Sequence, residues 1–191
     1  HAGGKLVWDD EHAMFRPDGE RPPTGNDGEQ MVTTVGAANG HMSTGGALEN
    51  TVSAMARLTG TLTAPPRTQD PETGPILPVW MMPQGAQKKL RMKAWLDYQN
   101  DVKVSDVQLA AQEGFESVEH AKRYTTLGMA TDQGKLSNIN GLAILSDALG
   151  APIPDVGTTT FRPPYTPTTF GAIVNHARGK LFVIRIRHIF F

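Results

Sequence analysis

The sequence predicts an α+β fold in which a small helical domain follows a strand–turn–helix unit and lies between extended arms. Three segments between residues 94 and 150 carry the start and stop signals of short helices. A β-branched segment at residues 31–35 runs into a glycine-rich turn, as a strand does before a helix. Prolines cluster at residues 65–83 and 152–167, where they disfavour long helices and predict extended chain.

Each of the three predicted helices begins at a serine that can cap it and ends near a glycine. The serine–glycine pairs are Ser105 and Gly114, Ser117 and Gly128, and Ser137 and Gly150. Gln108 is placed as a capping-box partner of Ser105, and Asn140 follows Ser137 at the same spacing. The second helix is expected to run to about Thr126.

The N-terminal part predicts one strand–turn–helix unit among irregular chain. Residues 5–8 can form a short strand, and the polar residues 9–30 are expected to form a surface loop. Residues 31–35 are expected to form a buried strand, followed by a helix that starts between residues 43 and 46. Helix amides point at whatever lies over such a turn, so it can face a phosphate or cofactor. The candidate residues are Gly36, Ala37, Asn39 and Gly40. A plain connection that needs glycine for positive φ is the alternative, which the pattern alone favours.

Two proline-rich segments flank the helical domain. Residues 61–87 contain six prolines, which predict an extended connector and a domain boundary. An apolar island in this connector can form an edge strand interrupted by Pro78, and residues 94–98 form a short extended entry to the helices. After Gly150 we expect an extended arm, and the alternating residues 182–187 predict an edge strand or an aggregation-prone end.

Composition excludes several classes of function. The 191 residues suffice for one domain or parts of two, and the net charge of −1 gives no electrostatic basis for binding nucleic acid or an anionic membrane. Because the chain has no cysteine, it has no disulfide and no thiolate metal site. No apolar run reaches the roughly 18 residues of a spanning helix, so a cytoplasmic protein is expected. The first residue is not Met, from which we expect a processed or excised piece.

The loop between the second and third helices, GMATDQGK, is the first candidate for chemistry. It fails the phosphate-loop pattern twice, because five residues separate Gly128 and Gly134 and because Leu136 replaces the metal-binding hydroxyl. A looser anion site survives, with backbone clearance at a glycine, one lysine charge and a helix N-terminus. Its candidate residues are Thr131, Asp132, Gln133, Gly134, Lys135, Ser137 and Asn138. An ordinary capped loop is an equally good interpretation.

Other catalytic and binding motifs are disfavoured. The six histidines have no metal-ligand spacing, and His120 shares a helix face with Glu116 and Arg123, where a solvated partner is the better interpretation. No nucleophile elbow is present. The first two helices resemble a helix-turn-helix, but Glu116 and Glu119 offset the basic Lys122 and Arg123, which disfavours DNA binding.

The sequence resembles the α subunit of heterotetrameric sarcosine oxidase. The dense part of this resemblance is DYQNDVKVSDVQLAAQEGFESVEHAKRYTTLGMATDQGKLSNINGLAI with GTTTFRPPYTPTTFGAI, within residues 94–173. A weaker part, MVTTVGAANGHMSTGGALENTVSA, is similar to the end of that subunit's pyridine-nucleotide–disulfide-oxidoreductase-like domain. The resemblance implies four regions: the tail of that domain (1–64), a proline-rich linker (65–93), a helical domain with an extended arm (94–173) and a divergent tail (174–191).

The resemblance also implies a function for the parent complex. Sarcosine oxidases of this kind demethylate sarcosine and pass the one-carbon unit to tetrahydrofolate. They hold FAD on the β subunit, FMN between α and β, and NAD on α, and they place the amine site on β. The expected partners are therefore a β-type flavoprotein subunit and further small subunits. No catalytic residue is assigned here, and the isolated chain is expected to hold no cofactor and to be inactive, because the dinucleotide fingerprint is missing from it.

The helical domain is also similar to the bacterioferritin-associated-ferredoxin module, which holds a [2Fe–2S] cluster with four cysteines. The corresponding positions fall near Asp97, Gln99, Asp132 and Ser137, so this copy is expected to keep the scaffold without the cluster. Its loop could then face the intersubunit flavin. After residue 173 the sequence departs from the family, which implies a frameshift or a truncation that removes the folate site. The alternative function is a non-catalytic helical module that only scaffolds a partner.

Overall fold

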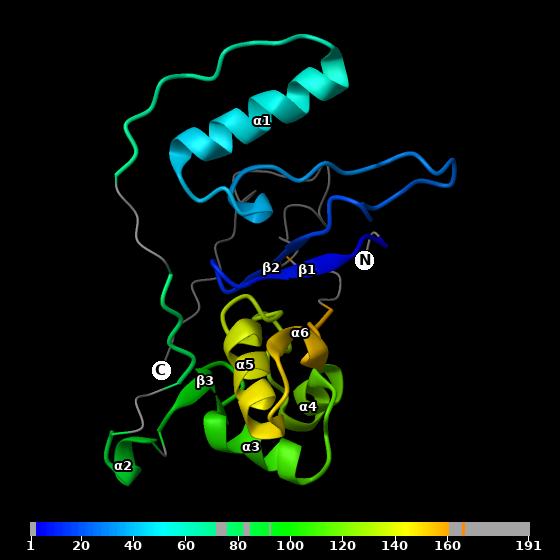
Figure 1. The fold of residues 1–191 in the computed structure, drawn as a ribbon. Helices are drawn as coiled ribbons and strands as arrows, with labels where there is room; N and C mark the ends of the chain where they lie inside the picture. The colour runs from blue at the N-terminus through cyan, green and yellow to red at the C-terminus, as the bar shows by residue number, and fades with distance from the viewer. Residues whose placement is uncertain (1–2, 72–75, 82–84, 92, 161–165, 167–191) are drawn as a thin grey trace, which may run out of the picture.

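A computed structural model describes residues 3–71, 76–81, 85–91, 93–160 and 166 of the chain. The β1–β2 hairpin lies between the long helix α1 and a bundle formed by α3, α4, α5 and α6 (Figure 1). In chain order the elements are β1 Leu6–Asp9, β2 Met14–Pro17, η1 Gly36–Asn39 (a 3-10 helix), α1 Thr44–Thr59, α2 Lys88–Arg91, β3 Trp95–Asp97, β4 Val102–Lys103, α3 Val104–Gln112, α4 Val118–Thr125, α5 Asn138–Leu149 and α6 Ile153–Val156. The α+β prediction is therefore confirmed.

The core of the described chain lies in the helical bundle. Helix α3 packs against both α4 and α5, and α6 packs back onto α5. The most deeply buried apolar side chains are Val102, Val107, Ala110, Leu127, Leu142, Ile144 and Leu145. Strands β3 and β4 pair antiparallel and lead into α3, as expected for the short extended entry at residues 94–98. The three helices predicted between residues 94 and 150 are thus present.

The predicted helix starts are partly right. Helices α4 and α5 begin directly after Ser117 and Ser137, but neither serine side chain makes a cap hydrogen bond. Helix α3 begins at Val104, so the prediction that Ser105 caps it is wrong. The carboxylate of Asp106 accepts the Lys103 amide at 2.8 Å instead, and a charged acceptor makes the stronger bond at this position. Gly150, at φ 63°, ends α5 as predicted.

Two predictions for the N-terminal part are wrong. Residues 9–30 are not all loop, because β2 pairs antiparallel with β1 and sets Phe15 opposite Trp8. The two rings meet edge to face at 5.1 Å, and Phe15 also packs on the helical core, a contact distant in sequence. Residues 31–35 form no strand, because no strand within the described residues pairs with them. Helix α1 does begin after Ser43, whose Oγ accepts the Gly46 amide at 3.0 Å.

The proline-rich segments are mostly irregular. Residues 61–71 and 76–81 have no helix or strand, as expected of extended chain, whereas the predicted edge strand around Pro78 is wrong. Proline has no amide hydrogen to donate to a neighbouring strand. The arm after Gly150 includes the short helix α6, which Pro152 and Pro154 accommodate at its first turn. The predicted strand at residues 182–187 and the tail from 174 lie outside the described residues.

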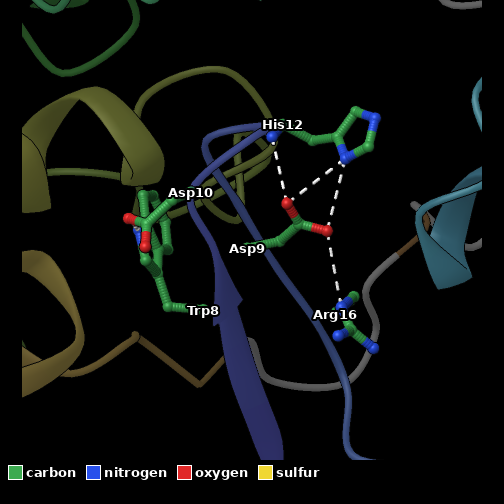
Figure 2. A network of polar contacts seen from close by, with 5 residues as sticks. All are labelled: Trp8, Asp9, Asp10, His12 and Arg16. Carbon is green, nitrogen blue, oxygen red and sulfur yellow. Dashed lines mark hydrogen bonds and ion pairs between the residues drawn. The ribbon is translucent and has the colours of Figure 1, made fainter.

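A small polar network holds the turn of the hairpin (Figure 2). The Asp9 carboxylate accepts the backbone amide of His12 at 3.1 Å and lies 3.2 Å from its Nδ1 and 3.4 Å from Nε of Arg16. These contacts, the His12 amide first, hold the pKa of Asp9 below its ordinary value despite partial desolvation. The carboxylate form therefore stabilises the turn.

We expect this turn to loosen only in acid. A carboxyl with a lowered folded pKa contributes stability that is complete above its unfolded pKa of about 3.9 and is lost as pH falls through the folded value. An NMR titration should show the Asp9 carboxyl and the His12 amide changing together below about pH 4. Asp9→Asn should remove that transition and loosen the His12 amide already at neutral pH. An Asp9 pKa at or above the ordinary value would contradict the network.

Gly141 in α5 provides a test of the core packing. Gly→Ala in a helix usually stabilises by about 1 kcal/mol. A Cβ at Gly141, however, would overlap the Leu127 side chain, which is only 2% exposed. We expect Gly141→Ala to lower the free energy of unfolding by about 1–3 kcal/mol in urea denaturation. In a Leu127→Ala background the same change should be neutral or stabilising, and an equal loss in both backgrounds would refute the packing argument.

Candidate functional site

The candidate site is built around the buried carboxylate of Asp97, at the end of β3. This side chain belongs to a residue that is 3% exposed, yet its oxygens accept four N–H groups. Oδ1 accepts the amides of Gln99 at 2.9 Å and Asn100 at 3.0 Å, as in an Asx turn. Oδ2 accepts Nδ2 of Asn100 and the amide of Gly128, both at 2.8 Å. The bond from the Gly128 amide ties the β3–β4 hairpin to the loop that follows α4.

The loop of residues 128–137 satisfies its own polar groups. The Asp132 Oδ2 accepts both the Gly134 amide and the Ser137 hydroxyl at 2.9 Å. A Cβ at Gly134 would overlap the Asn138 carboxamide, so a side chain of the chain itself fills the space beside this glycine. Two of the donors predicted for an anion and the clearance beside Gly134 are therefore used internally.

Beside this loop lies an open groove of about 440 Å³ with mostly apolar walls. It is lined by Leu96, Asp97, Tyr98, Gln99, Thr131, Asp132, Lys135 and Leu136. Tyr98 and Leu136 are 80% and 77% exposed, although both side chains are large and apolar. The side-chain Nε2 of Gln99 donates to the Thr131 hydroxyl and so joins the two walls. A flat or apolar surface that carries polar groups at its edge would fit against this groove.

The described chain after α6 returns to this loop. The Thr159 hydroxyl accepts Nδ2 of Asn138, and the Thr160 amide donates to Oε1 of Glu119 at 2.6 Å. The Oδ1 of Asn138 is buried with no hydrogen-bond partner. Sequence reasoning missed this segment, since neither threonine carries a local signal. It also missed Tyr98 and Leu136, whose exposure only coordinates reveal.

The glycine-rich turn before α1 lies elsewhere in the fold. Gly36, Ala37 and Asn39 fall in η1, with Gly40 at its end, beside α1 and across the hairpin from α5 (Figure 1). The first amides of α1 are occupied, because Thr44 and Gly45 donate to the Asp70 carboxylate at 2.9 and 2.7 Å. The two groups of candidate residues are therefore not brought together. Within the described residues no cluster of three possible metal ligands occurs, and no helix is long and apolar enough to cross a membrane.

The helical core thus carries a polar loop and an open groove whose walls come from β3 and from that loop. The family model described as "Sarcosine oxidase A3 domain" matches residues 91–176, so this segment is similar to that domain. The resemblance to sarcosine oxidase α subunits found in the sequence is thereby confirmed.

Relatives extend this similarity across nearly the whole chain. Sarcosine oxidase subunit alpha of Rhizobium meliloti (strain 1021) is 39% identical over 188 residues, which are 95% of this chain and 18% of the relative. The subunits of the same name from Corynebacterium sp. strains P-1 and U-96 are 37% and 35% identical over 93% of this chain and 18% of their own length. The chain thus spans about a fifth of the length of these relatives.

Asp97 should dominate the stability of the site. Asp97→Asn keeps the shape but sets an amide hydrogen against N–H donors and removes the charge, so we expect a loss of about 1.5–3 kcal/mol in the free energy of unfolding. The Gly128 amide should also exchange faster with solvent. Asp101→Asn is the matched control, because Asp101 is exposed at φ 57°, which asparagine tolerates, and it should change stability by less than about 0.5 kcal/mol. Equal effects of the two variants would show that the carboxylate is not the hub.

Proposed function

We propose that the chain is part of the α subunit of a flavin-dependent sarcosine (secondary amine) oxidase, and that it contributes to an FMN-bearing subunit interface instead of the amine site. The observation that carries this is the groove within the segment matched by the sarcosine oxidase A3 domain model. The partners would be a β-type flavoprotein subunit and further small subunits in a heterotetramer. A cytoplasmic location stays a prediction.

The residues of the groove fit a contact with the edge of a bound flavin better than a closed phosphate cradle. FMN would supply the redox chemistry in the assembled complex. Tyr98 and Leu136 offer exposed apolar surface for its ring system, and Lys135 on the same rim brings a positive charge. Gly134 and Ser137 would act indirectly, by fixing the loop through Asp132. Thr131 would do the same through Gln99.

The ferredoxin-like comparison is part of the same proposal. The four positions that correspond to cluster cysteines lie around one groove or its loop: Asp97, Gln99 and Asp132 line it, and Ser137 donates to Asp132. In this chain, hydrogen bonds would replace the cluster as the link between the β3–β4 hairpin and the loop of residues 128–137. The turn residues Gly36, Ala37, Asn39 and Gly40 stay candidates for an NAD contact in a longer polypeptide.

A non-catalytic scaffold is the second candidate function, and one observation favours it. The loop donors are already paired within the chain, so the exposed Tyr98 and Leu136 could simply pack against a partner. In that case Lys135 would contribute nothing to flavin binding. In either case the chain alone is expected to show no sarcosine turnover.

Lys135→Met in the assembled complex separates the two functions. The change removes the charge and keeps much of the stem, so FMN content, measured by absorbance after desalting at increasing salt, should fall if Lys135 meets the phosphate or flavin edge. A lost charge-assisted contact would weaken FMN binding by roughly 10-fold to 150-fold. Lys89→Met, at an exposed position in α2, is the control. Unchanged FMN content with intact assembly would leave the scaffold function.

A further inference from the structure

A second cavity lies where the proline-rich connector meets the helical domain. It has a volume of about 390 Å³, and among the described residues it shares Leu96 and Tyr98 with the groove of the candidate site. Leu96 and Val104, each 7% exposed, form its base, whereas Val79 and Tyr98, 75% and 80% exposed, stand at its rim. Its size and its mostly apolar and aromatic lining are those of a small-molecule site.

Aromatic rings from two segments line the cavity. Trp80 comes from the connector, and Trp95 and Tyr98 come from β3 and the turn after it. Trp80 packs against the helical core, which holds the connector wall in place. The ammonium of Lys103 lies 4.5 Å from the ring centroid of Trp95, but Lys103 does not line the cavity, so this cation steadies the ring from outside. The walls are therefore suited to a flat ring.

The polar groups of the cavity favour an anion. Lys93 is the one charged side chain among the described residues that line it, and its ammonium forms no ion pair with another described residue. The carboxamide of Asn140, from the first turn of α5, lines the cavity without a hydrogen bond to any other described residue. Residues 85–96 contain four basic residues and no acidic one, which makes the local potential positive. The next carboxylate along the chain, Asp97, is already held by four N–H groups.

We infer that this cavity binds a small aromatic carboxylate, with its ring against Trp80 and Trp95 and its carboxylate at Lys93. Lys93 would repel an ammonium compound, and a neutral ring would leave this lysine without a partner. Asn140 would make one further hydrogen bond at the edge of the ring. The function proposed for the loop of residues 128–137 is not required for this site, because no residue of that loop lines the cavity.

The indole N–H signals of the three tryptophans test this inference by NMR on the chain as it is. Addition of 2-naphthoate at millimolar concentration should shift the Trp80 and Trp95 signals in a saturable way. Trp8, on β1, should not shift and serves as the internal control. 2-Naphthamide keeps the ring without the charge, and decahydro-2-naphthoate keeps the charge and the size without the aromatic ring. Both should bind about 2-fold to 10-fold more weakly. Equal affinity for 2-naphthoate and 2-naphthamide, or equal shifts of all three indoles, would overturn the inference.

Two substitutions separate the charge from the wall. Lys93→Met removes the charge and keeps much of the stem, so 2-naphthoate should bind about 2-fold to 5-fold more weakly while 2-naphthamide is unaffected. Lys89→Met, at an exposed position that does not line the cavity, is the matched control and should change neither affinity. Trp80→Leu keeps an apolar wall without the ring and should weaken 2-naphthoate by about 3-fold to 10-fold. Equal effects of the two lysine variants would show that the charge acts at no particular site, and the inference would be wrong.

A second copy of the chain is the competing occupant. If the Trp80 and Trp95 signals shift with protein concentration in the absence of any acid, and sedimentation shows a dimer, the cavity is a self-association surface and the inference is wrong. FMN content enters none of these measurements, so a failure here leaves the function proposed for the loop untouched.

Discussion

The helical domain depends on one buried charge that is fully hydrogen-bonded. A carboxylate taken out of water is costly unless donors replace its hydration, and Asp97 has four N–H donors. Three of them come from two nearby residues, Gln99 and Asn100, so the turn after β3 forms locally. The fourth, from Gly128, comes from the far end of α4 and sets where the loop begins. The Asn100 contact to the Met129 carbonyl and the Gln99 contact to Thr131 follow from that placement.

Local signals in the sequence predicted most of the helices. A helix boundary set by a preceding serine or a following glycine depends only on a few neighbouring residues. The predicted starts of α1, α4 and α5 and the predicted end of α5 therefore agree with the structure. The error at α3 is also local, since the Asp106 carboxylate accepts the Lys103 amide and so fixes the helix start before Ser105. Strands depend on distant partners. Phe15 becomes part of β2 through Trp8 and the helical core, and residues 31–35 lack a partner strand within the described chain.

The candidate loop was identified from sequence, but its internal chemistry was not. Gly134, Lys135 and Ser137 suggest an anion site only while their neighbours are ignored. In the structure Asp132 takes the two donors and Asn138 fills the space next to Gly134. A loop rich in both donors and acceptors can satisfy itself, and one-dimensional spacing does not reveal which pairs form. The groove beside it was not predictable, because its walls come from β3 and from a loop more than thirty residues later.

The contacts of Thr159 and Thr160 connect the end of the described segment 93–160 to the loop of residues 128–137. The described segment 93–160 ends at a point fixed to Glu119 of α4 and to Asn138 of α5. Asn138 in turn packs against Gly128 and Gly134, at both ends of the loop. A displacement of Thr159 would therefore reach the loop directly, through one side chain that contacts both.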